Sequence, residues 1–253
     1  MRRRASSNTR FLPRGLTILH EDRDILVVDK PAGLLTIATD RDKSRTAYFI
    51  LTDYVRKGYS KSPKRLFIVH RLDRETSGVL VFAKNAEAKL RLQGGWEETE
   101  KTYLAVVHGK MAAREETITT YLAENRAHVD YSTTNAREGK LSHTAYRVLR
   151  EAKGLSLLEV ELLTGRKHQI RVHLADIGHP IVGDTKYGNA YGKRHGEKHG
   201  RGGGPHTRLA LHARSISFTH PSSGERLTFE AEVPSFFSGL VGRLDRGSRE
   251  SDG

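Results

Sequence analysis

Asp73, which stands between Arg71 and Arg74 in the sequence, is the residue best suited to do chemistry. Nearby cations favour the ionised form of a carboxyl group, and an ionised carboxylate can act as a nucleophile or as a general base. An aspartate beside arginines in a loop is also common in turns and in surface ion pairs. On these three residues alone, both interpretations stand.

Two apolar segments enclose the stretch that carries Asp73. Residues 65–70 (RLFIVH) and 78–84 (GVLVFAK) are rich in β-branched and aromatic residues, which predicts two β-strands. The polar residues between them then form a loop on a rigid scaffold, and site residues commonly lie on such loops.

Short strands are predicted along most of the chain, and helices are few. One helix is expected at 85–92, and a second is indicated by Ile170, Leu174 and Ile177 at helical spacing, with Gly178 at its end and Arg171 near its start. The remaining strands are expected at 16–22, 24–30, 101–109, 116–122, 144–149, 155–163, 209–220 and 226–233. This order predicts an α+β fold with a mixed, mostly antiparallel sheet and flanking helices.

One catalytic domain is expected to span residues 17–240. A basic flexible tail would precede it at 1–16, and a second flexible tail would follow at 241–253. Within the domain, residues 189–205 are glycine-rich and basic with almost no apolar anchors, so we expect an inserted loop there.

The charge balance favours a polyanionic partner. Lysine and arginine number 43 against 30 acidic residues, a formal net charge of +13 at pH 7. RNA or DNA is the leading candidate for such a chain, although a basic surface without a nucleic-acid role would give the same count.

The sequence contains no cysteine, which excludes disulfides, thiolate nucleophiles and cysteine-ligated zinc. It has no apolar run of membrane-spanning length and no secretory signal after its first arginines. We therefore expect a cytoplasmic protein without membrane association. Nothing indicates an obligatory protein partner, so a monomer is expected.

Two groups of histidines raise the question of a metal site: His168, His173 and His179 in one segment, and His195, His199 and His206 in the basic loop. Both groups lack an acidic or cysteine partner at familiar ligand spacing. We therefore expect no metal. The first group is expected to pack and form hydrogen bonds, and the second to face solvent or RNA.

Five segments of the sequence are together similar to the RluA-type pseudouridine synthases, enzymes that isomerise uridine in RNA. Residues 70–85 (HRLDRETSGVLVFAKN) resemble their catalytic signature, and Asp73 stands in the place of its aspartate. Four other segments also resemble the family and stand in the family's order along the chain: 25–34 (ILVVDKPAGL), 101–109 (KTYLAVVHG), 162–188 (LLTGRKHQIRVHLADIGHPIVGDTKYG) and 209–234 (LALHARSISFTHPSSGERLTFEAEVP). They are distributed over most of the range 17–234.

The resemblance implies a cofactor-free isomerase in which Asp73 helps to break the bond between uracil N1 and ribose C1′, so that the base rejoins through C5. Whether ribose C1′ or uracil C6 is the first electrophile is left open. Tyr103 would pack its ring against the target base and assist removal of the C5 proton. Arg171 would pair with Asp73 through its guanidinium fork. Without the resemblance, Tyr103 would be an ordinary strand tyrosine and Arg171 a charged residue on a helix surface.

Chemistry on a base requires that the base leave its stack. The resemblance implies that Arg71 fills the vacated space, and we expect His70, Arg166 and His168 to contact RNA beside it. The expected substrate is a transfer RNA or a large-subunit ribosomal RNA, with a slight preference for transfer RNA because the architecture is compact.

Many members of the family carry a small RNA-binding domain of the S4 type before the catalytic domain. Here the family-like sequence begins near residue 17, so we expect no such domain. RNA affinity would then come from the catalytic cleft, the basic start of the chain and the loop at 189–205, which is longer and more basic than expected for the family.

Two rival functions remain at this stage. One is a non-catalytic RNA-binding or ribosome-assembly protein that has kept the fold, although the presence of Asp73, Tyr103 and Arg171 together argues against it. The other is a hydrolase of glycosidic bonds, which needs a second carboxylic acid within reach. Glu75 and Asp184 are the nearby candidates for that acid, and the sequence assigns neither a convincing role.

Overall fold

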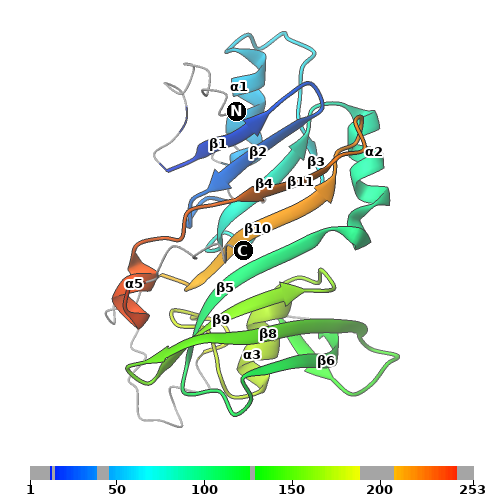
Figure 1. Cartoon of the computed structure of the whole chain (residues 1–253). Helices are drawn as coiled ribbons and strands as arrows, with labels where there is room; N and C mark the ends of the chain where they lie inside the picture. Colours follow the sequence, from blue (N-terminus) through cyan, green and yellow to red (C-terminus); the bar gives the residue numbers. More distant parts are fainter. Residues whose placement is uncertain (1–11, 13–14, 39–45, 126–128, 189–207, 244–253) are drawn as a thin grey trace, which may run out of the picture.

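The fold is organised around one sheet of eleven strands (Figure 1). The computed structural model describes residues 12, 15–38, 46–125, 129–188 and 208–243. The strands are β1 (Thr17–Glu21), β2 (Ile25–Lys30), β3 (Phe67–Ile68), β4 (Ser77–Ala83), β5 (Glu100–His108), β6 (Glu115–Glu124), β7 (Asp130–Thr133), β8 (Lys140–Ala152), β9 (Leu155–Leu162), β10 (Leu211–Thr219) and β11 (Arg226–Glu230).

The strand order along the sheet is β1-β2-β4-β10-β5-β9-β8-β6-β7, with β3 paired to β4 and β11 paired to β10. All of these pairs are antiparallel except β4 with β10, which run parallel. The mixed, mostly antiparallel sheet confirms the expected α+β fold. It places β4 and β5, which lie on either side of β10, at the centre of the sheet.

Four α-helices and a short 3₁₀ turn accompany the sheet in the described part of the chain: α1 (Ala47–Arg56), α2 (Ala86–Gly94), η2 (Trp96–Glu98), α3 (Gln169–Asp176) and α5 (Phe236–Val241). The side chains of Thr46 and Asn85 cap α1 and α2 by accepting hydrogen bonds from backbone N–H groups in the first turn. Figure 1 shows α1 beside β1 and β2, α2 at one side of the sheet, and α3 beside β6 and β8. None of the described helices has the length and apolarity that a membrane crossing requires.

The apolar core lies on both faces of the central strands. All seven residues of β4 are buried, because the larger core cluster receives Leu80 and Phe82 while the smaller one receives Val79 and Val81. Successive side chains of a strand point to opposite faces, so a strand covered on both sides is apolar throughout. This explains why β4 is a continuous apolar run in the sequence.

The predicted helices at 85–92 and around Ile170 are confirmed as α2 and α3. The elements α1, β7 and α5 were not predicted from the sequence. Two residues at the edges of the expected domain are also buried: Leu16, assigned to the first tail, and Val241, assigned to the second. The loop expected at 189–205 lies outside the described residues.

Gly78 allows β4 to approach β10 beside the loop that carries Asp73. Its φ is +114°, and a Cβ at this position would lie 2.2 Å from the carbonyl oxygen of Ala213. Gly78 pairs with Ala213 in the parallel register, and the neighbouring Ser77 hydroxyl is 2.9 Å from Nδ1 of His212. Only glycine fits this backbone conformation and this contact.

We expect Gly78→Ala to lower the free energy of unfolding by roughly 3 kcal/mol, because backbone strain and overpacking against the β10 backbone act together. Equilibrium unfolding in denaturant measures the change. Gly94→Ala is the matched control, since nothing lies within 4 Å of its added Cβ at the end of α2. That control should be neutral or stabilising by up to about 1 kcal/mol. Equal stabilities for the two variants would contradict the close approach.

Candidate active site

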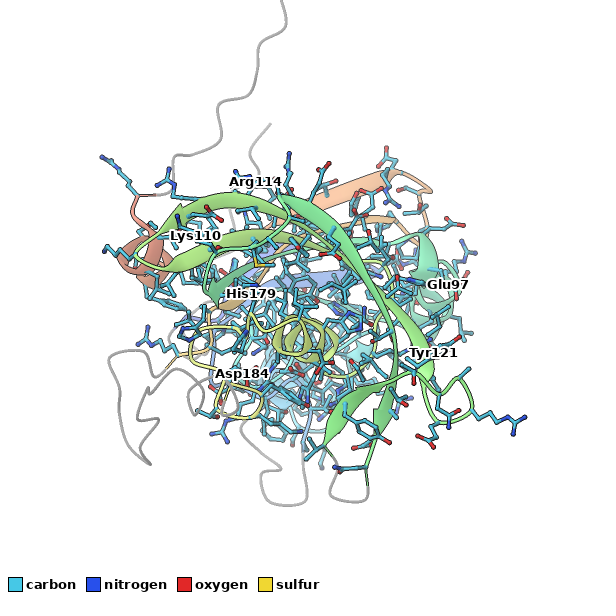
Figure 2. All side chains as sticks on the ribbon, turned by 90° about the horizontal axis from the view of Figure 1, so that it is seen from below. Glu97, Lys110, Arg114, Tyr121, His179 and Asp184 are labelled. Atoms are coloured by element: carbon cyan, nitrogen blue, oxygen red, sulfur yellow. The ribbon has the colours of Figure 1, made fainter. Side chains whose placement is uncertain are left out.

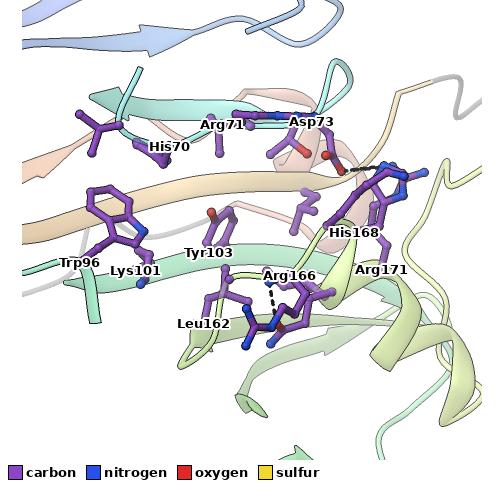
Figure 3. Close-up of a pocket in the computed structure, with 18 of the residues that line it drawn as sticks. His70, Arg71, Asp73, Trp96, Lys101, Tyr103, Leu162, Arg166, His168 and Arg171 are labelled. Carbon is purple, nitrogen blue, oxygen red and sulfur yellow. Dashed lines mark hydrogen bonds and ion pairs between the residues drawn. The ribbon is translucent and has the colours of Figure 1, made fainter. Parts of the chain in front are cut away.

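A cavity of about 470 Å³ opens between the loop that joins β3 to β4 and the N-terminal end of α3. Its volume is in the range of sites that hold small-molecule ligands or bases. Figure 3 shows Asp73, His168 and Arg171 grouped at one end, Tyr103 in the middle, and Trp96 and Lys101 at the other end. The cavity therefore brings together residues that lie far apart in the chain.

The segment after β2 fixes the loop that carries Asp73. The Thr36 hydroxyl donates to the carbonyl of Leu72 at 2.7 Å and accepts from its N–H at 3.2 Å. Lys30 is fully buried, and its ammonium donates to three backbone carbonyls, those of Pro31, Leu34 and Arg74. Burial lowers the pKa of Lys30 to about 8. These bonds hold the backbone on both sides of Asp73.

Arg171 bridges two carboxylates at the bottom of the cavity. Its Nε donates to Asp184 Oδ2 at 2.7 Å and its Nη2 to Asp184 Oδ1 at 2.9 Å. Its third nitrogen, Nη1, donates to Asp73 Oδ2 at 3.3 Å. Asp184 therefore takes the bidentate geometry, and Asp73 receives a single, longer bond from the same guanidinium.

The two carboxylates differ in exposure, and this difference separates their roles. The Asp184 side chain is 1% exposed and also accepts from the backbone N–H groups of Lys186 and Tyr187. The Asp73 side chain is 25% exposed and faces the cavity. Asp184 thus holds Arg171 in place, while Asp73 keeps lone pairs available to a molecule in the cavity.

Hydrogen bonds and opposite charges hold Arg171 in its charged form. Burial by itself disfavours the cation, but the bonds and charges of Asp184 and Asp73 outweigh it and raise the pKa of Arg171 above its usual value. Arg171 is thus a permanent counter-charge beside Asp73. The alternative that Arg171 is an ordinary residue on a helix surface is wrong, because its side chain is buried.

His168 links Asp73 to a third carboxylate. Its Nε2 lies 3.6 Å from Asp73 Oδ2, and its Nδ1 lies 2.9 Å from both Asp130 Oδ2 and the Tyr187 hydroxyl. Its φ of +52° is uncommon for a residue other than glycine. Burial lowers the pKa of His168, and the charge of Asp73 acts in the opposite direction.

Tyr103 contributes a buried ring to the wall of the cavity. It lies on β5 and is 8% exposed. Burial and the charge of Asp73 raise the pKa of Tyr103 above its ordinary value. Its hydroxyl is therefore protonated at neutral pH, and in that state it donates hydrogen bonds rather than accepting a proton as a base.

Arg71 and Arg166 line the cavity with exposed side chains, one on each side of its mouth. The backbone at Arg166 is fixed by Gln169, whose buried amide accepts from the Arg166 N–H and donates to the carbonyl of His143. These two arginines are therefore exposed cations at the cavity.

His70 lines the cavity, but contacts within the protein hold its ring in place. Its Nε2 accepts a hydrogen bond from the backbone N–H of Val81 at 3.0 Å, and its ring packs on Trp96 with centroids 4.8 Å apart. Burial and the neighbouring charge of Lys101 lower the pKa of His70 to about 3, so the ring is neutral. Any contact it makes with RNA is therefore that of an uncharged ring.

The histidines considered as metal ligands do not converge. His173 is fully buried between the hydroxyls of Thr120 and Thr144, and His179 lies 2.9 Å from the carbonyl of His108. His195, His199 and His206 lie outside the described residues. Among the described residues, Asp22, Asp24 and His220 are close enough to share an ion. The Asp22 carboxylate, however, caps the turn between β1 and β2, and the Asp24 carboxylate accepts hydrogen bonds from Asn85 and Ser222.

Three residues of this site were missed, or were given no role, on the sequence alone. Asp184 was considered only as a possible acid, whereas it binds Arg171 through two hydrogen bonds. Asp130 belongs to β7, which was not predicted. The only sequence signal for Lys101 was its position two residues before Tyr103, which places both on one face of a strand.

The geometry weighs against a glycosidic hydrolase. Such an enzyme needs a second carboxyl group free to protonate a leaving group. Asp184 is buried and bound to Arg171, and Glu75 is exposed beside Arg74, 3.7 Å away. Neither of these two candidate acids is available at the cavity.

Comparisons with known proteins identify the family. A sequence profile of the RNA pseudouridylate synthase family matches residues 24–176. An Aquifex aeolicus protein named an uncharacterized RNA pseudouridine synthase is 38% identical over 239 residues, covering 92% of this chain and 74% of the relative. A Rickettsia bellii protein named ribosomal large subunit pseudouridine synthase C is 33% identical over 226 residues, covering 87% and 69%.

Solved structures support the same relationship. The human RNA pseudouridylate synthase domain containing 1 structure aligns with a TM-score of 0.66 and 27% sequence identity, covering 94% of this chain and 89% of that one. The family match extends over more than half of the chain, and the named relatives are more than 30% identical over most of it. The chain therefore belongs to the RluA-type RNA pseudouridine synthases, the enzymes that isomerise uridine in RNA to pseudouridine.

Proposed function

We propose that Asp73 is the catalytic carboxylate of this synthase and that the target uracil occupies the cavity after leaving its stack. The observation that carries the proposal is the geometry at Asp73. A partly exposed carboxylate faces the cavity while a buried cation, Arg171, pairs with it from behind. An ionised carboxylate so placed attacks, or stabilises, the sugar or base when the N1–C1′ bond breaks.

Tyr103 is proposed to pack its ring against the target base. Its position in the wall between Asp73 and Lys101 supports this role. Because the raised pKa of Tyr103 keeps its hydroxyl protonated, we assign the hydroxyl to donating a hydrogen bond to the base rather than to removing the C5 proton. This refines the role that the family resemblance implies.

Arg71 is proposed to fill the space that the base leaves in the RNA. The exposure of its side chain at the cavity mouth, two residues from Asp73, supports that role. Arg166 and His168 are proposed to contact the RNA on the opposite wall. The contribution of His70 is limited to its neutral ring, since its nitrogen is bonded to the β4 backbone.

The substrate is proposed to be a large-subunit ribosomal RNA, with transfer RNA as the alternative. The slight preference for transfer RNA drawn from the architecture is outweighed by the names of relatives such as the Rickettsia bellii protein, which refer to the large ribosomal subunit. Action as a monomer in the cytoplasm, without metal or cofactor, stays a prediction.

Mapping of pseudouridines in RNA from cells with and without this gene tests the proposal. We expect one or a few positions in large-subunit ribosomal RNA to lose the modification in the deletion strain. Return of the modification with the wild-type gene, but not with an Asp73→Asn copy, would connect the position to this site. An unchanged map in both RNA classes would favour the rival function, a non-catalytic RNA-binding protein on the same fold.

A further inference from the structure

Lys101 is a buried cation without a matching anion. Its side chain lies in the wall of the cavity at the end marked by Trp96, and the residue is 8% exposed. Within the described part of the chain, no carboxylate lies within ion-pair distance of its ammonium and no side-chain hydrogen bond to it is formed. Burial lowers the pKa of Lys101, and no neighbouring negative charge offsets this effect.

The nearest groups to Lys101 are aromatic and uncharged. Its ammonium lies 5.5 Å from the centroid of the Trp96 ring, a cation–π distance that offsets only part of the cost of burial. On the other side of this end of the cavity, the neutral His70 ring packs against Trp96. The pair of rings therefore shapes the pocket but supplies no counter-charge.

The other cations of the cavity are in different situations. Arg171 already pairs with Asp73 and Asp184. Arg71 and Arg166 are exposed, so water solvates their charges. Lys167 is also exposed and pairs with Glu124 and Asp130. Lys101 alone among these five cations is both buried and unpaired in the described structure, and a desolvated charge gains most from an anion that enters beside it.

The position of Lys101 relative to Tyr103 suggests which anion this is. The two residues lie two positions apart on β5, so their side chains leave the same face about 7 Å apart along the strand. A nucleotide whose base packs on Tyr103 would then place its neighbour in the chain near Lys101. The cavity is also larger than a single pyrimidine requires.

We propose that Lys101 and Trp96 form a second subsite, in which the Lys101 ammonium binds the phosphate group next to the target uridine. The proposal rests on the proposed placement of the uridine at Asp73 and Tyr103. The subsite would fix the strand on one side of the turned-out nucleotide, while Arg71 acts on the other side of the cavity mouth. Positioning of the strand in this way contributes to RNA affinity rather than to bond breaking.

The test compares Lys101→Gln and Lys101→Met with Lys110→Gln. Lys110 is exposed beyond the opposite end of β5, so its substitution removes the same charge outside the cavity. Figure 2 shows Lys110 on the other side of the molecule from Glu97, the neighbour of Trp96 in the chain. The probe is a short synthetic RNA containing the uridine that mapping identifies, and a second copy carries an uncharged methylphosphonate at the phosphate beside that uridine.

We expect each Lys101 variant to bind the unmodified RNA roughly tenfold more weakly than wild type, the scale of one charged hydrogen bond. The slope of log affinity against log salt should become shallower by about 0.7 to 0.9, the release of one counterion. The methylphosphonate should weaken binding by wild type and by Lys110→Gln to a similar degree, and should leave binding by the Lys101 variants unchanged.

Thermal melting without RNA separates this subsite from a structural role. Removal of an unpaired buried charge should leave Lys101→Met as stable as wild type or more stable. If Lys101 instead served the fold, the substitution would lower the melting temperature. The proposal is overturned if the Lys101 variants show the wild-type salt slope. It is also overturned if the methylphosphonate, placed in turn at each of the two phosphates that flank the uridine, weakens binding by the Lys101 variants as much as it weakens binding by wild type.

Pseudouridine formation by wild type is measured on the same RNA. If wild type forms no pseudouridine there or in any cellular RNA, the proposed function has failed. If pseudouridine forms and the Lys101 variants bind like wild type, the subsite alone has failed.

Discussion

Replacement of Asp73 by asparagine is expected to lower the rate of pseudouridine formation by at least about 10³-fold, or roughly 4 kcal/mol of transition-state stabilisation. Asparagine keeps the size of the side chain and part of its hydrogen bonding, but it removes the charge that attacks or stabilises the reacting sugar or base. The fold should persist, because the Asp73 side chain is partly exposed and receives one long hydrogen bond from Arg171.

RNA affinity should move in the opposite direction from activity in this variant. Removal of a negative charge from a cleft that binds a polyanion should leave binding unchanged or slightly tighter. Single-turnover rates and equilibrium binding on the mapped RNA measure the two effects separately.

Glu75→Gln provides a matched control for Asp73→Asn. Glu75 is an exposed carboxylate two residues further along the same loop, so its substitution makes the same chemical change outside the cavity wall. We expect its activity to stay within a few-fold of wild type. Formation of pseudouridine by purified Asp73→Asn within tenfold of wild type would refute the assignment of Asp73.

Asp184→Asn is expected to lower the free energy of unfolding by about 3 to 5 kcal/mol, the usual cost of removing one partner from a buried ion pair. Oδ1 of Asp184 accepts from the N–H groups of Lys186 and Tyr187, and an amide oxygen can still accept those bonds. The amide nitrogen would then take the place of Oδ2 and face Nε of Arg171, so two donors would meet. Arg171 would also lose its main counter-charge.

Activity should fall with stability in Asp184→Asn, even at temperatures where the variant is folded. Arg171 would be drawn toward Asp73, its remaining partner, and would compete with the substrate for that carboxylate. Denaturant unfolding and kcat at a permissive temperature measure the two effects. Asp176→Asn, an exposed aspartate at the end of α3, is the matched control and should change neither.

A double substitution distinguishes the structural effect from the chemical one. Arg171→Met together with Asp184→Asn removes the guanidinium whose donors the new amide would oppose. Replacement of a buried pair by an uncharged one is often neutral, so much of the stability should return. Activity should not return, because Asp73 has lost its cation. Recovery of both properties together would show that Arg171 serves the fold alone.

Local patterns in the sequence were sufficient to predict the elements that carry Asp73 and Arg171. The continuous apolar run at 78–84 specified β4 because both of its faces are covered, and the spacing of Ile170 and Leu174 specified α3 because that period matches a helix. Both signals come from residues a few positions apart. The positions of Tyr103 on a strand and of Asp73 in a loop between strands follow from the same kind of pattern, and the structure confirms both.

Patterns of this kind failed where an element depends on distant partners. The strand β7 has four residues and, within the described residues, pairs with β6 alone. The helix α1 depends on burial of Ala47 and Leu51 against the sheet. Short elements have little local signal of their own, because most of their stability comes from tertiary packing.

The family resemblance placed Asp73, Tyr103 and Arg171 in one site, but the arrangement within that site depended on the tertiary structure. Asp184 is thirteen residues from Arg171, and no local period indicates that its carboxylate is the one bound by two hydrogen bonds. Asp130 lies on β7, at one edge of the sheet, and its carboxylate is 2.9 Å from His168 at the start of α3. The sequence by itself thus determined which groups are present and which elements carry them. The tertiary structure decided which carboxylate is partly exposed, which is buried and which lysine is unpaired, because burial and charge pairing depend on the neighbours that folding brings together.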